Sequence, residues 1–141
     1  VLSERRMRSS DAGAPAGVPA LGVRLGGLGP GGRERLHYPD LLLLMADGRR
    51  IAIELELTSK GRGRREQILG GYAAEVTIDA VLYLAPTLPL ARAIQASAAR
   101  MAIDRLVKVQ MISLPSRDPG GRDRRGVERR RQRVPGAEVS R

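Results

Sequence analysis

The strongest constraint on the fold of this chain is a strict alternation of apolar and other side chains over residues 51 to 58. The odd-numbered positions of this run are isoleucine or leucine, and the even-numbered positions include Glu54 and Glu56. A second apolar run, residues 41 to 45, has no helical spacing, and Asp47-Gly48 lies between the two runs. Because strand side chains point alternately to opposite faces, the pattern predicts a β-hairpin with one acidic face.

The length of the turn decides whether Asp40 joins that acidic face, since a change of one residue moves a strand side chain to the other face. A two-residue loop of Asp47-Gly48 sets Asp40 opposite Leu55. A three-residue loop over residues 46 to 48, with Gly48 in the left-handed region, sets Asp40 opposite Glu54. Asp-Gly suits both turns, and we expect the three-residue loop.

Like charges at neighbouring strand positions repel, so a cluster of Asp40, Glu54 and Glu56 requires a cation or a changed protonation state. Carboxylate oxygens are hard ligands and suit Mg²⁺ or Mn²⁺ better than a softer metal. The chain has no cysteine and a single histidine, His37, which excludes a zinc cluster. We therefore expect the three acids to bind Mg²⁺ or Mn²⁺.

These residues resemble the PD-(D/E)xK nuclease-like superfamily. The resemblance is carried by Pro39-Asp40, the hairpin, Glu54-x-Glu56 and the Gly/Arg-rich start of a helix. Over roughly residues 36 to 112, the string PDLLLLMADGRRIAIELELTSKGRGRREQILGGYA, followed by DAVLYLAP, is similar to the C-terminal region of plasmid replication-relaxation family proteins.

The resemblance implies a DNA-acting protein of plasmid or mobile-element replication, with a Mg²⁺-dependent phosphodiesterase site that nicks or cleaves DNA. Asp40, Glu54 and Glu56 would be catalytic and metal-binding, with Lys60 as a further catalytic residue that offsets charge on the phosphate. The superfamily usually has a lysine where Glu56 stands, so Lys60 would have to reach back from the following loop.

A basic segment follows the acidic strand, and we predict that Arg62, Arg64 and Arg65 bind DNA phosphates. The net charge of +10 favours a polyanionic partner. Arginine-rich composition without a binding role is the competing interpretation for the two ends of the chain.

The rest of the chain predicts an α/β fold. Residues 64 to 76 and 90 to 106 are expected to be helices, and residues 79 to 85 and 107 to 112 are expected to be strands. The strand, helix, strand order predicts a right-handed crossover and a parallel pair. Together these elements give a mixed β-sheet with a β-hairpin and a βαβ crossover flanked by helices, similar to a restriction-endonuclease-like core.

Three segments are expected along the chain. Residues 1 to 32 are rich in glycine and predict a flexible leader, with at most a short strand at residues 20 to 25. Residues 33 to 115 form the core, and residues 116 to 141 form a disordered, arginine-rich tail. The first helix of the superfamily core is then either a turn at residues 5 to 10 or lost from a fragment.

No run is apolar enough to span a membrane and no signal-peptide core is present, so we expect a cytoplasmic protein without membrane contact. One alternative function is a catalytically inactive nuclease-fold module that binds DNA or protein, with Glu56 marking lost activity. Another is a structural domain whose glutamates face solvent on an edge strand. We expect His37 to be a surface residue rather than a proton carrier.

Overall fold

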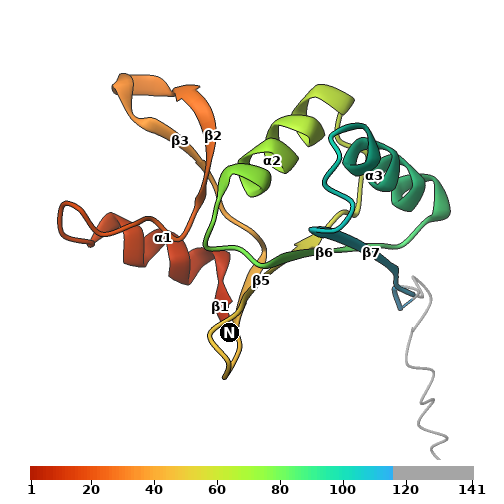
Figure 1. Cartoon of the computed structure of the whole chain (residues 1–141), viewed down its shortest axis with the longest axis horizontal. Coiled ribbons are helices and arrows are strands. Elements are labelled where there is room, and N and C mark those ends of the chain that lie inside the picture. The colour runs from red at the N-terminus through yellow and green to blue at the C-terminus, as the bar shows by residue number, and fades with distance from the viewer. Residues whose placement is uncertain (116–141) are drawn as a thin grey trace, which may run out of the picture.

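The computed structural model describes residues 1–115, which form three α-helices, a five-stranded sheet and a separate two-stranded hairpin (Figure 1). The predicted tail, residues 116–141, lies outside the described residues. In spatial order, the large sheet contains β1 (Leu2–Ser3), β4 (Leu41–Leu44), β5 (Arg50–Leu55), β6 (Ala80–Ala85) and β7 (Val107–Met111). The hairpin pairs β2 (Val23–Leu28) with β3 (Glu34–His37), joined through the short 3₁₀ turn η1 (Pro30–Gly32).

The helices are α1 (Glu4–Ala12), α2 (Arg62–Ala74) and α3 (Leu88–Arg100). The last two connect parallel strands, since α2 leads from β5 to β6 and α3 leads from β6 to β7. This confirms the predicted mixed sheet with its crossover. Helix α3 ends at Arg100, earlier than expected, because Ala102 adopts a φ of 55°, outside the right-handed helical region. Within residues 1–115, no helix is long and apolar enough to cross a membrane.

The turn between β4 and β5 follows the three-residue prediction. Met45 N donates to Arg49 O at 2.8 Å and closes the loop over residues 46–48, and Gly48 has a φ of 89°. The strands pair Leu41 with Ile53, so continuing the register by one residue sets Asp40 opposite Glu54. The predicted register is confirmed.

The acidic face of the hairpin is the buried face of the sheet. Figure 1 shows α2 and α3 together on one side of the sheet. Glu54 faces that side, because its carboxylate accepts a hydrogen bond from Tyr72 of α2, and Ala52 shares its face of β5; both are buried. The apolar residues of the other face are more exposed: Leu41 is 37% and Leu55 is 39% exposed. The interpretation with glutamates facing solvent on an edge strand is therefore wrong, since β5 lies inside the sheet.

The first 32 residues are built into the fold rather than forming a flexible leader. Met7 of α1 and Val23 of β2 are 0% and 1% exposed and belong to the core. Asp11 caps the backbone of this segment by accepting a hydrogen bond from Leu21 N at 2.9 Å, and Arg8 lies over the ring of Tyr38. The prediction of a flexible leader is thus corrected. The high glycine content suggested no core residue in this segment, but Met7 and Val23 are enough to hold it against the core.

Candidate functional site at the end of strand β5

Three acidic residues and one lysine meet where β5 ends and the chain turns toward α2. Asp40 immediately precedes β4, Glu54 lies in β5, Glu56 follows β5, and Lys60 lies in the loop before α2. The Asp40 side chain crosses to the neighbouring strand, where its Oδ2 accepts a hydrogen bond from Leu55 N at 2.6 Å. This bond ties the start of β4 to the end of β5.

Glu54 is 3% exposed, and two side chains from other elements satisfy its carboxylate. Its Oε1 lies 2.6 Å from His37 Nε2 of β3 and also accepts a hydrogen bond from the Tyr72 hydroxyl of α2. The rings of His37 and Tyr72 meet edge to face, with centroids 5.9 Å apart. Because a buried carboxylate is costly without partners, this cluster fixes β3 and α2 against the sheet.

Neither His37 nor Tyr72 was among the residues selected from sequence. The His37 side chain is only 15% exposed, so the expectation of a surface histidine is wrong. Its position three residues before Asp40 was the available signal. Tyr72 lies within the helix predicted over residues 64 to 76, and nothing in the helical spacing indicates that its hydroxyl meets Glu54.

Glu56 is 2% exposed and is matched by Lys60. Lys60 Nζ lies 2.6 Å from Glu56 Oε2, while the backbone N of Lys60 donates to Oε1 at 3.2 Å. The loop therefore folds back on the strand end. An ammonium group stands beside the side chain that replaces the lysine of the resembled motif.

The three arginines of the basic segment have different environments. Arg65 is 5% exposed, donates from Nη2 to Lys60 O at 2.8 Å, and keeps a buried Nε without a partner among the described residues. Arg62 and Arg64 are exposed and bond to Glu66 and Gln67 on α2. Only Arg62 and Arg64 thus present their guanidinium groups at the surface, whereas Arg65 supports the loop from inside.

Burial and the negative charges of the acids raise the pKa values of two tyrosines, Tyr72 and Tyr83. Burial raises the pKa of Tyr72 and of Tyr83 far above the usual range of a phenol, and the charge of Glu54 raises both further. Asp40 adds to the pKa rise of both phenols, and Glu56 adds to that of Tyr83. Both hydroxyls therefore stay protonated, which lets Tyr72 act as a hydrogen-bond donor to Glu54.

The predicted set of three metal ligands is not assembled as such. Among residues 1–115, no group of three or more His, Asp or Glu side chains is placed to hold a metal ion. Glu56 is occupied by the Lys60 ammonium. Within the same residues, one oxygen of Asp40 and one of Glu54 accept no hydrogen bond, and two carboxylates with water are a usual protein ligand set for Mg²⁺. Of the three predicted ligands, Asp40 and Glu54 thus each keep one carboxylate oxygen available to a cation, whereas Glu56 is paired with Lys60.

No family model matches the chain, and comparisons with curated proteins and with solved structures find no significant match. The resemblance to the PD-(D/E)xK superfamily and to replication-relaxation proteins stays a prediction from motifs.

Proposed function

We propose that this chain is a DNA-acting protein whose phosphodiesterase site lies at the end of β5. The observation that carries the proposal is the 2.6 Å contact between Lys60 Nζ and Glu56 Oε2. The resembled motif has a lysine at the position of Glu56. Through this contact, the Lys60 ammonium takes the place of that missing lysine side chain. The register that sets Asp40 opposite Glu54 supports the same assignment.

In this proposal, Asp40 and Glu54 hold one Mg²⁺ or Mn²⁺. When bound, the metal would lower the pKa of its water and stabilise charge on the phosphate. Lys60 would offer its ammonium to a non-bridging phosphate oxygen, and Glu56 would hold that ammonium in place. Arg62 and Arg64 would contact phosphates on either side of the scissile bond.

The biological setting that we propose is the replication of a plasmid or mobile element. It rests on the similarity of residues 36–112 to replication-relaxation proteins. The net charge of +10 supports a nucleic-acid partner, because an excess of arginine attracts the phosphate backbone independently of base sequence.

Nicking of supercoiled plasmid in Mg²⁺ or Mn²⁺ tests the proposal. We expect Asp40→Asn and Glu54→Gln to slow nicking by about a hundredfold or more, as on loss of groups that stabilise transition-state charge. Lys60→Met should lower the rate as well. The matched control is Asp47→Asn, because Asp47 is an exposed acid in the hairpin loop whose one partner in the described part of the chain is Arg49. Equal nicking by all variants would remove the proposal.

A second candidate function is a nuclease-fold module that binds DNA without cutting it. It is favoured because the polar groups of the site already have protein partners. Glu54 Oε1 contacts both His37 and Tyr72, and the Lys60 ammonium is paired with Glu56. This candidate predicts salt-sensitive DNA binding, weakened by Arg62→Ala with Arg64→Ala and unchanged by Asp40→Asn. Absence of nicking together with that binding pattern would select it over the first.

A further inference from the structure

Strand β7 forms one edge of the large sheet and, among the described residues, pairs only with β6. Leu106 O and Ile112 N point toward β6, where their bonds to Val81 N and Ala85 O measure 2.9 and 3.0 Å. Backbone groups of successive strand residues point to opposite edges. The odd-numbered residues of β7 therefore direct their backbone groups to the free edge. Among residues 1–115, the one such group already bonded is Val107 N, which donates to Ile103 O at 3.1 Å.

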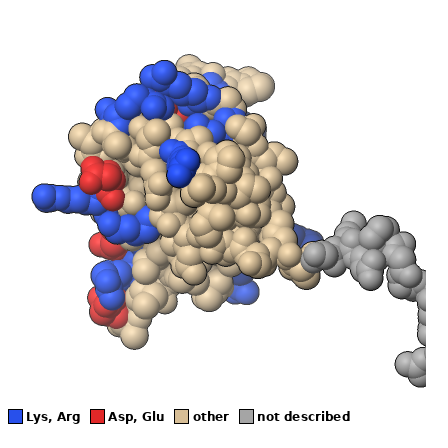
Figure 2. Space-filling view, turned by 90° about the vertical axis from the view of Figure 1, so that its right-hand side faces the viewer, with Lys and Arg blue, Asp and Glu red and all other residues tan. Residues whose placement is uncertain are grey.

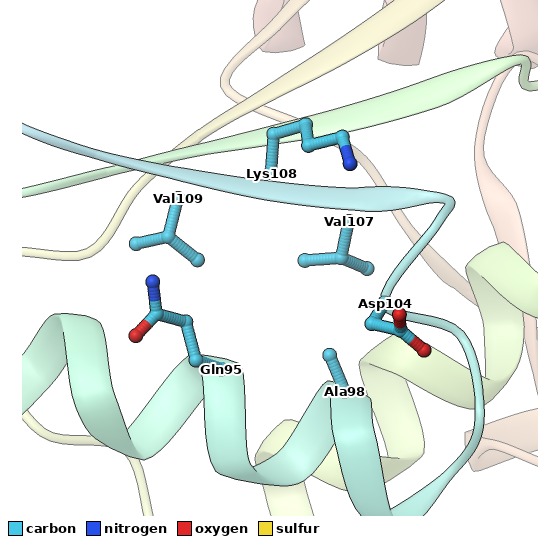
Figure 3. Close-up of a pocket in the computed structure, with 6 residues that line it drawn as sticks. All are labelled: Gln95, Ala98, Asp104, Val107, Lys108 and Val109. Carbon is cyan, nitrogen blue, oxygen red and sulfur yellow. The ribbon is translucent and has the colours of Figure 1, made fainter.

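Beside this edge lies a cavity of about 320 Å³ between α3 and β7. Figure 3 shows Val107 and Val109 pointing into it toward Ala98 and Gln95, while Lys108 points away to the other face of the sheet. Met111 shares the face of the two valines by strand alternation and is 48% exposed. An open cavity, whose lining also includes the Asp104 carboxylate, and an uncovered apolar side chain thus adjoin the same free edge.

We propose that β7 pairs antiparallel with β7 of a second copy of this chain, about a twofold axis at Val109. This register sets Val109 of one copy opposite Val109 of the other. It also places Met111 of each copy opposite Val107 of the other copy, at the mouth of the cavity that this Val107 lines. Lys108 then faces Gln110, so no like charges stand opposite one another. In this register, Val109 N–H of each copy donates to Val109 O of the other. Met111 N–H of each copy donates to Val107 O of the other.

The distribution of charge leaves an area of few charges in which a second copy can pair. Two chains of net charge +10 repel, so they can associate only where the surface carries few charges. Figure 2 turns toward the viewer the side of the molecule on which α3 and β7 lie. Most Lys and Arg lie along its top and left margins, one stands inside its upper part, and a broad uncharged area occupies the centre. A twofold interface uses the same patch twice, which suits a strand that is complementary to itself.

Disulfide trapping tests the register, because the chain has no cysteine of its own. Antiparallel hydrogen-bonded residues have Cα atoms about 5.5 Å apart, within the range of about 4.4–6.8 Å that a disulfide requires. Under mild oxidation, we expect most chains of Val109→Cys to form a covalent dimer. Lys108→Cys alone should form no covalent dimer, because residue 108 of one copy does not stand opposite residue 108 of the other. A mixture of Lys108→Cys and Gln110→Cys should cross-link. Ser10→Cys, exposed on α1, controls for random collision.

Light scattering on the unmodified chain should give twice the monomer mass. Val109→Pro removes an edge-facing N–H without costing a bond to β6, so we expect a folded monomer, with folding checked by circular dichroism. Val109→Thr keeps the shape and the N–H and should stay dimeric. A monomeric wild type overturns the proposal. So does a dimer that Val109→Cys fails to trap, or one that Lys108→Cys alone traps equally well.

Discussion

Lys60 Nζ lies 2.6 Å from Oε2 of Glu56, a carboxylate that is 2% exposed. The contact joins the end of β5 to the loop before α2, and the backbone N of Lys60 strengthens it by donating to the other carboxylate oxygen. The Lys60 side chain is 36% exposed, so its ammonium pairs with a buried acid while still reaching solvent. The loop is thus both anchored and open to a ligand.

Loss of the lysine should destabilise the fold through the acid that it leaves behind. We expect Lys60→Met to lower the free energy of unfolding by about 1–3 kcal/mol, because Glu56 would be buried with only the backbone N–H to satisfy it. The double variant Lys60→Met with Glu56→Gln should recover most of that loss, since the buried charge is gone. Urea unfolding measures both, and a double variant no better than the single one would contradict this account.

The two adjacent glycines of α2 should respond in opposite directions to alanine. A Cβ at Gly70 would meet Met101 Cε at 3.6 Å, an ordinary contact, so Gly70→Ala should gain up to about 1 kcal/mol of helix stability. A Cβ at Gly71 would lie 2.8 Å from Arg24 O of β2, which is backbone and cannot yield cheaply. Gly71→Ala should therefore lose about 1–3 kcal/mol. Thermal unfolding compares the pair, and equal effects would contradict the close packing of α2 on β2.

Alkaline pH should unfold the protein as its tyrosines ionise. Burial, followed by the hydrogen bond to Asp11, raises the pKa of Tyr38 to about 12, and the pKa values of Tyr72 and Tyr83 are raised further. A tyrosine whose pKa is higher in the folded than in the unfolded state stabilises the fold. That contribution is fully present below the unfolded-state pKa of about 10 and is lost as pH rises toward the folded-state pKa. Tyrosinate absorbance should show none of the three tyrosines titrating normally in the folded protein. Early ionisation of one tyrosine without unfolding would contradict this result.

Truncation of one side chain in α1 should test whether the first residues belong to the core. Met7 is fully buried, so Met7→Ala should lower the free energy of unfolding by about 2–5 kcal/mol. The neighbouring Arg6 is exposed, and Arg6→Ala serves as the control with little expected effect. Chemical unfolding of both variants gives the comparison, and matching stabilities would mean that α1 contributes little.

Local sequence chemistry was enough to predict the hairpin register, because Gly48 and the parity of the strands decide it together. The crossover was likewise predictable from the order of strands and helices. Alternation defines two faces of β5 but does not say which one a helix covers, so the burial of Glu54 was not foreseen. The meeting of His37 with Glu54, like the burial of Arg65 and Met7, depends on packing between elements distant in sequence.

The order of the strands bears on how the chain acquires its structure during synthesis. From β4 through β7, neighbours in the sheet are also successive strands in the sequence. Each strand leaving the ribosome can therefore join the edge formed just before it, and none has to be inserted between partners that have already paired. Only β1 adds on the opposite side, where it must wait for β4 to be made.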